Sequence, residues 1–156
     1  MIAVLQRVIE ARVVVDERIV GEIGHGILVL VAVAQDDTQE DVQWMANKLA
    51  SIRMFRSGDG EKHFELDVRE VNGSILLVSQ FTLAAQTKKG RRPSFERAAA
   101  PEVGKKLFDE LVKAVGELKI PTATGQFAAD MRVSLTNDGP VTFILESRSN
   151  AGPSSA

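Results

Sequence analysis

The chain has 156 residues, no cysteine and a formal net charge of −2. This length suits one domain, and the lack of cysteine excludes both a disulfide scaffold and a thiolate nucleophile. The slight excess of acidic residues argues against a protein that coats nucleic acid, but it permits a small site that grips one RNA end. The first residues lack the pattern of a signal peptide, and the longest apolar run, residues 27–34, is far short of the roughly 20 residues that span a bilayer. We therefore expect a cytoplasmic protein with no membrane contact.

The first third of the chain predicts three strands. Residues 4–15 are rich in Val and Ile and alternate imperfectly, and Asp16-Glu17 is a plausible hairpin turn before a return strand at 18–20. Residues 27–33 are apolar without alternation, which indicates a strand buried on both faces.

Two helices are predicted from apolar stripes and start signals. Thr38 is a suitable N-cap because acidic residues follow it in the first turn, and Pro101 suits the first turn of the second helix. The first stripe consists of Val42, Met45, Ala46, Leu49 and Ile52, and the second of Val103, Leu107, Phe108, Leu111, Val112 and Val115.

The remaining segments predict more strands. Residues 75–78 form a second buried strand, and residues 131–135 alternate as a strand that turns at 137–140 and returns through 141–145. The order of strands, helix, strand, helix and strands predicts one mixed α/β (α+β) domain over residues 1–147. Residues 148–156 are small and polar, and we expect a disordered tail.

Ser79-Gln80-Phe81-Thr82 follows the second buried strand. Backbone N–H groups that leave a strand end are free of ladder bonds, and such donors can hold a developing oxyanion. The hydroxyls of Ser79 and Thr82 add donors, and the Phe81 ring can stack on a base. The alternative is a plain strand end that runs into a loop.

Asn137-Asp138-Gly139-Pro140 also has two interpretations. These are common turn-forming residues, so a simple hairpin turn is one of them. The other is a cis Gly139-Pro140 bond, which would direct neighbouring carbonyls to one side and form a rigid polar wall without a side chain.

Lys88-Lys89-Gly90-Arg91-Arg92-Pro93 is the one strongly basic segment of a mildly acidic chain. This segment, called the basic loop below, is either a solvated run of charges or a binding site for RNA phosphates. His25 and His63 are not spaced with a second ligand as zinc requires, so we expect no metal and no cofactor.

Taken together, these segments resemble the D-aminoacyl-tRNA deacylase (D-tyrosyl-tRNA deacylase) family over nearly the whole chain. The resemblance rests on motifs in the family's order: Val4-Leu5-Gln6-Arg7-Val8, Ser79-Gln80-Phe81-Thr82-Leu83, Lys89-Gly90-Arg91-Arg92-Pro93-Ser94-Phe95, Gly125-Gln126-Phe127-Ala128-Ala129-Asp130-Met131 and Asn137-Asp138-Gly139-Pro140-Val141-Thr142. It implies a compact α/β domain with a mostly antiparallel, barrel-like sheet and two main helices. It also implies a homodimer with active sites at the interface.

The resemblance further implies hydrolysis of the ester between a D-amino acid and the 3′-terminal adenosine of tRNA, with L-aminoacyl-tRNA rejected. tRNA-Ala mischarged with glycine would also be a substrate. The implied roles are catalysis by Ser79, Gln80, Phe81 and Thr82; chiral selection by Gly139, Pro140 and the supporting Arg7; adenine binding by Phe81, Phe95, Phe127 and Met131; and phosphate binding by Lys88, Arg91 and Arg92.

Three rival functions remain open from the sequence. One is a non-catalytic RNA- or DNA-binding module that uses the basic loop. The second is a dimeric scaffold whose motifs are only turns and strand ends. The third is a hydrolase of small D-amino acid esters or peptides, which would not need the basic loop.

Overall fold

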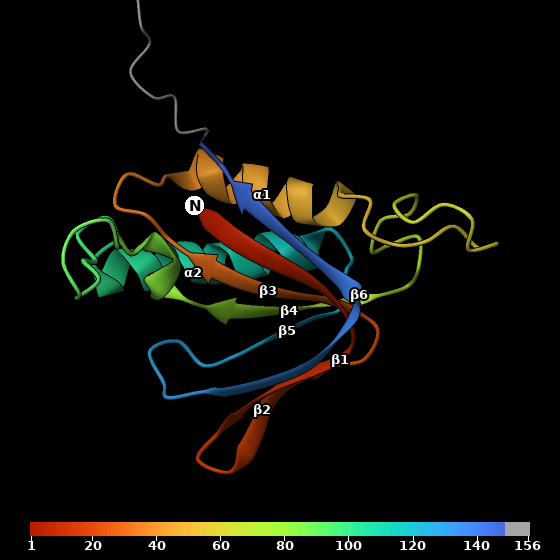
Figure 1. The fold of residues 1–156 in the computed structure, drawn as a ribbon, viewed down its shortest axis with the longest axis horizontal. Helices are drawn as coiled ribbons and strands as arrows, with labels where there is room; N and C mark the ends of the chain where they lie inside the picture. Colours follow the sequence, from red (N-terminus) through yellow and green to blue (C-terminus); the bar gives the residue numbers. More distant parts are fainter. Residues whose placement is uncertain (149–156) are drawn as a thin grey trace, which may run out of the picture.

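The computed structural model describes residues 1–148 of the chain. Its sheet is organised around a long first strand. The strands are β1 (Ile2–Val15), β2 (Arg18–Ile23), β3 (Gly26–Ala32), β4 (Ser74–Ser79), β5 (Thr122–Thr124) and β6 (Arg132–Glu146). β1 pairs with β3 along its first half and with β2 along its second half, while β6 runs antiparallel along its other edge. β4 and β5 continue the sheet from β3 in parallel (Figure 1).

The sheet curls so far that it nearly closes. Gly21 of β2 approaches the backbone of β5 so closely that a Cβ atom there would lie 2.1 Å from the Thr124 carbonyl oxygen. The β1–β2 hairpin turns at Asp16 and Glu17, whose φ angles of 47° and 64° match the left-handed turns that suit twisted hairpins. The predicted hairpin is therefore confirmed.

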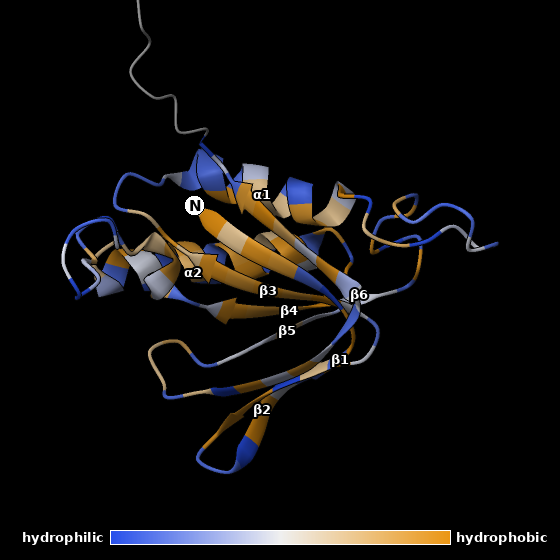
Figure 2. Cartoon of the chain, in the orientation of Figure 1, coloured by the Kyte–Doolittle hydropathy of each residue, from blue (hydrophilic) through white to orange (hydrophobic). Residues whose placement is uncertain are grey.

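Both predicted helices are present, α1 (Gln39–Ser51) and α2 (Pro101–Glu117). Thr38 is the N-cap of α1 in a capping box with Asp41, and Pro101 occupies the first turn of α2. Together the helices cover one face of the sheet, with their polar sides outward (Figures 1 and 2).

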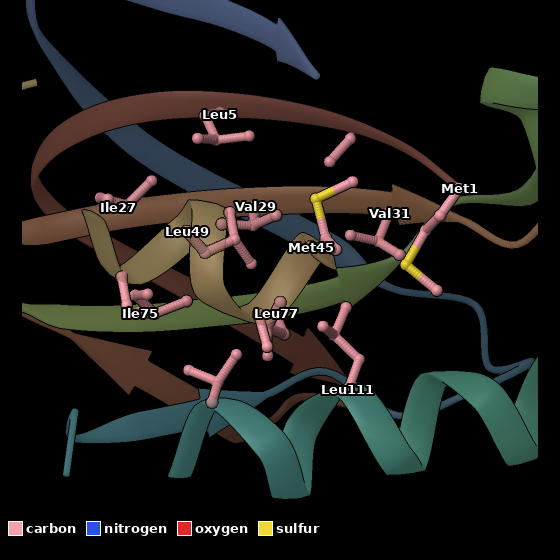
Figure 3. Packing of buried hydrophobic residues seen from close by; sticks show 14 of the residues in the cluster. Met1, Leu5, Ile27, Val29, Val31, Met45, Leu49, Ile75, Leu77 and Leu111 are labelled. Atoms are coloured by element: carbon pink, nitrogen blue, oxygen red, sulfur yellow. The ribbon is translucent and has the colours of Figure 1, made fainter. Parts of the chain in front are cut away.

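The core lies between this sheet face and the helices. Leu5, Val29 and Leu77 of the sheet are fully buried against Leu49 of α1 and Leu111 of α2 (Figure 3). A smaller cluster on the opposite face is built from Val8, Val13, Leu28, Leu76 and Val78. β3 and β4 thus have apolar side chains buried on both faces, as their unbroken apolar runs predict.

Two predictions are wrong. Residues 137–140 do not reverse the chain, because β6 is one strand that continues past them. Val133 pairs with Val13 and Leu145 with Ala3, and the extra residues form an irregularity opposite Val8. Val103 does not belong to the buried stripe of α2, since the residue is 45% exposed and the adjacent Gly104 is buried instead.

The predicted disordered tail begins at Arg148. Arg148 is held at the end of β6 by hydrogen bonds to Asp41, and the rest of the predicted tail, residues 149–156, lies outside the described residues. Within residues 1–148, no helix is long and apolar enough to cross a membrane.

Candidate active site

A cavity of about 510 Å³ lies where β3 and β4 end. Its walls come from the segment after β4, the start of α2 and the loop before β6. The lining residues with a bearing on chemistry are Ser79, Gln80, Phe81, Gly104, Phe108, Phe127 and Met131. The cavity therefore brings together the 79–82 segment and the 125–131 segment, which the sequence separates by more than forty residues.

The segment after β4 presents free backbone donors. The N–H of Gln80 continues the sheet ladder by donating to the Val31 carbonyl, at 2.7 Å. The chain then forms a short 3-10 turn, Phe81–Ala84, and the first N–H groups of such a turn have no partner within it. In the described part of the chain, nothing accepts a hydrogen bond from the N–H of Phe81 or Thr82. The N–H groups of Phe81 and Thr82, rather than that of Gln80, are therefore free to meet a ligand.

The side chains of this segment face solvent at the cavity mouth. Phe81 is 58% exposed, and its ring packs against the Phe95 ring in a T-shaped contact, with centroids 5.1 Å apart. The Gln80 side-chain amide donates to the Thr82 hydroxyl, which lies beside the cavity and outside its lining. Phe95 is also outside the lining, so its contact with the site passes through Phe81.

The opposite wall is apolar. The ring of Phe127 packs on Phe108 of α2, with centroids 6.1 Å apart. Gly104 faces this wall, and a methyl group there would lie in van der Waals contact with the Phe127 ring, at 3.6 Å. Met131 completes the wall beside Gly125. Gly104 and Phe108 were missed as site residues from sequence, since both read only as parts of a helix.

Arg7 anchors the 137–140 segment. Its side chain is buried, and the guanidinium donates to the Asp138 carbonyl at 2.9 Å and to the Met54 carbonyl at 2.7 Å. Burial lowers the pKa of Arg7; the Asp138 carboxylate, 3.5 Å away, opposes this effect and Arg56 adds to it. The Gly139-Pro140 bond is cis, as the family resemblance implied.

Within one chain the 79–82 segment and the 137–140 segment lie far apart. Arg7 pairs with Ile27 at the start of β3, whereas Ser79 pairs with Val31 near its end. Those positions are separated by about 13 Å, the rise of four strand residues. Figure 1 shows the same separation, with the bend of β6 at one end of the sheet and the end of β4 at the other. Gly139 and Pro140 do not line the cavity of their own chain.

The basic loop stands at the cavity end of the molecule. A backbone bridge between Gln86 and Ser94 closes its base, with N···O distances of 2.8 and 2.9 Å. Lys88, Arg91 and Arg92 are exposed, and none of them has an ion-pair partner within residues 1–148. Their charges are therefore accessible to an anionic ligand.

Comparison with known proteins identifies the family. A family model described as D-Tyr-tRNA(Tyr) deacylase matches residues 4–146. The chain belongs to this family. It is 57% identical over 151 residues to the D-aminoacyl-tRNA deacylase of Geobacter sulfurreducens, covering 97% of this chain and 98% of that protein. It is 55% identical over 146 residues to the enzyme of the same name from Pasteurella multocida, covering 94% and 99%.

Two solved structures share the fold. The c-Myc DNA unwinding element binding protein superposes with a TM-score of 0.89 at 36% identity, over 95% of this chain and 99% of that one. A probable eukaryotic D-amino acid tRNA deacylase superposes with a TM-score of 0.80 at 20% identity, over 92% and 97%, which supports the fold alone. The predicted family, mixed fold and hydrolase class are confirmed. These relatives do not favour the rival binding-module function over hydrolysis.

Proposed function

We propose that this chain hydrolyses the ester between a D-amino acid and the terminal adenosine of tRNA, and that it acts in the cytoplasm as a homodimer. The observation that carries the proposal is the cavity itself. It combines unpaired backbone donors with an aromatic and thioether wall that suits an adenine base. The close relatives named D-aminoacyl-tRNA deacylase support the same substrate.

The free backbone N–H groups suit hydrolysis of an ester by water. The N–H groups of Phe81 and Thr82 would stabilise the negative oxygen that forms when water attacks the ester carbonyl. An aminoacyl ester is already activated, so a modest reduction of the barrier suffices and no strong nucleophile is needed. The Thr82 hydroxyl, held by the Gln80 amide, would orient substrate or water, and the 2′-OH of the tRNA would assist in place of a protein base.

The adenosine would lie against Phe81, Phe127 and Met131, which all line the cavity. Phe95 would act indirectly, by supporting the Phe81 ring through their T-shaped contact. Lys88, Arg91 and Arg92 would contact phosphates of the acceptor end. If about three such contacts form, log affinity should fall with log salt with a slope of about −2.

Chirality would be selected by a second copy of the chain. The Gly139-Pro140 segment is held rigidly by Arg7 but lies far from its own cavity, so it is available to enter the cavity of a partner. Its carbonyls would bind the substrate amino group and leave no room for an L side chain. A D side chain would point outward, and glycine would have nothing to clash with.

The test is a paired deacylation assay on D-tyrosyl-tRNA and L-tyrosyl-tRNA, with buffer controls. Rapid loss of the D ester alone is the expected result. Loss of both esters would support the hydrolase and contradict selection by exclusion. Loss of neither, with tRNA shown to be properly charged, would contradict the proposed activity.

A further inference from the structure

A second groove adjoins the cavity, and nothing described so far uses it. It has a volume of about 490 Å³ and lies between α2 and the 124–127 segment. Phe108 and Phe127 line both the groove and the cavity, so these two packed rings separate the two spaces. On its other side the groove is lined by Lys105, Asp109 and Lys113, which succeed one another at four-residue intervals along α2.

A nucleotide chain whose terminal adenosine occupied the cavity would have to leave it past one of its walls. The Phe127 wall leads directly into the groove, and an aromatic ring offers a surface on which either base can stack. The groove is large enough for one further nucleotide. Its position therefore points to the residue of tRNA that precedes the terminal adenosine, which is a cytidine in every tRNA that ends in CCA.

The polar groups of the groove match cytosine. The Lys105 ammonium lies 2.6 Å from the Asp109 carboxylate, which places a donor and an acceptor side by side at the groove. Cytosine presents an N4 amino donor beside the acceptors N3 and O2, and carboxylates commonly accept from this amino group. Uracil presents an acceptor at position 4 and a donor at position 3, so a uracil kept in the position of the cytosine by its link to the terminal adenosine would meet the same pair with mismatched groups.

The Lys105–Asp109 ion pair contributes little to the stability of the fold. The side chains of Lys105 and Asp109 are 59% and 55% exposed, and pairs of this kind contribute little to stability. The Asp109 carboxylate would also repel a phosphate, so a base belongs beside it. Lys113, one helical turn further along α2, pairs loosely with the exposed Glu117 at 4.0 Å and is the groove cation placed to meet the phosphate.

We propose that this groove is a subsite for the penultimate cytidine of the tRNA, with Asp109 and Lys105 contacting the base edge. The subsite rests on the proposed function, since it extends the path of the same substrate. It predicts that the enzyme distinguishes CCA from CUA ends, although the two differ one nucleotide away from the scissile ester.

The experiment compares three substrates: D-tyrosyl-tRNA ending in CCA, the same tRNA ending in CUA, and D-tyrosyl-adenosine, with the D-tyrosyl group attached chemically. For the wild-type protein, kcat/KM should be about tenfold lower on the CUA end, in line with the loss of one base-edge pair. Asp109→Ala should hydrolyse the two tRNAs equally and should leave the rate on D-tyrosyl-adenosine unchanged.

Lys106→Ala is the matched control, because Lys106 is an exposed lysine of the same helix that does not line the groove. It should keep the preference for CCA. Equal rates of the wild-type protein on CCA and CUA, or an undiminished preference in Asp109→Ala, would overturn the subsite. Failure of the wild-type protein on both D-tyrosyl-adenosine and the CCA substrate would instead overturn the proposed function, and the subsite with it.

Discussion

Glycine is required at position 139 for two separate reasons. Its φ of +143° lies in a region that L side chains rarely adopt. A Cβ atom there would also lie 2.7 Å from a methyl group of Val141 and 3.3 Å from the Arg7 guanidinium. Any side chain at 139 therefore disturbs both the segment and the arginine that holds it.

Gly139→Ala tests the role of this residue in chiral selection. The added methyl group would displace the carbonyls of the segment, so hydrolysis of L-tyrosyl-tRNA should rise by about tenfold relative to the D ester. The measurement is the ratio of the two deacylation rates. Gly60→Ala is the control, because Gly60 also has positive φ, 76°, but open space around its Cα. An unchanged L-to-D ratio in Gly139→Ala would contradict the chiral wall.

At the scale of elements, a substitution at the close approach of β2 to β5 can test whether this contact fixes the near-closure of the sheet. Gly21→Ala would place a methyl group 2.1 Å from the Thr124 carbonyl oxygen, and a backbone atom cannot rotate out of the way. Overpacking of this kind costs about 1–3 kcal/mol, so the free energy of unfolding in urea should fall by that amount. Gly24→Ala, three residues along, meets nothing within 4 Å and should behave like the wild type. Equal stability of both variants would show that β2 moves freely away from β5.

A second test at this scale concerns the start of α1, which is tied to the end of β6. The buried Asp41 carboxylate accepts hydrogen bonds from Ser147, Arg148 and the Thr38 backbone. Burial alone would raise the pKa of Asp41, but these bonds outweigh it and hold the pKa well below its ordinary 3.8. The stabilisation that Asp41 provides is therefore complete above about pH 4 and is lost as the pH falls further.

Asp41→Asn should thus lower the free energy of unfolding by about 1–3 kcal/mol at pH 7, since it removes charge-assisted hydrogen bonds. The difference from the wild type should shrink as the pH falls below about 4. Urea denaturation at several pH values measures it. Glu40→Gln, an exposed residue of the same helical turn, should show little effect. A difference that does not depend on pH would contradict the ionised role of Asp41.

The sequence predicts most elements here, and its main error has a physical cause. Asn137-Asp138-Gly139-Pro140 has turn-forming composition, and local composition does not reveal whether the flanking strands pair with each other or with a third strand. β1 is long enough to pair with both flanks, so β6 continues instead of folding back. Likewise, the family resemblance singles out Phe81, Phe127 and Met131, which line the cavity, whereas the positions of Gly104 and Phe108 in its lining depend on how α2 packs.

At the scale of the whole molecule, each chain carries both halves of the proposed site at opposite ends of β3. Because a two-fold dimer repeats every contact twice, two copies could complete two sites with the same pair of surfaces. In the proposed function neither half alone accounts for chirality, because the cavity holds the backbone donors and the 137–140 segment would form the wall that excludes an L side chain. Activity should therefore depend on the dimer, and this dependence can be tested with two defective copies.

Phe81→Ala removes the exposed ring at the cavity mouth, and Gly139→Ala displaces the carbonyls that would bind the substrate amino group; each homodimer should therefore hydrolyse the D ester more slowly than the wild type. In a heterodimer of the two variants, the intact cavity of one subunit would receive the intact 137–140 segment of the other. The purified heterodimer, isolated with two different affinity tags, should then recover about half of the wild-type activity, because one of two sites is whole. If each site were completed within one chain, every subunit would still carry a defect. Activity no higher than the mean of the two homodimers would therefore contradict completion by the partner.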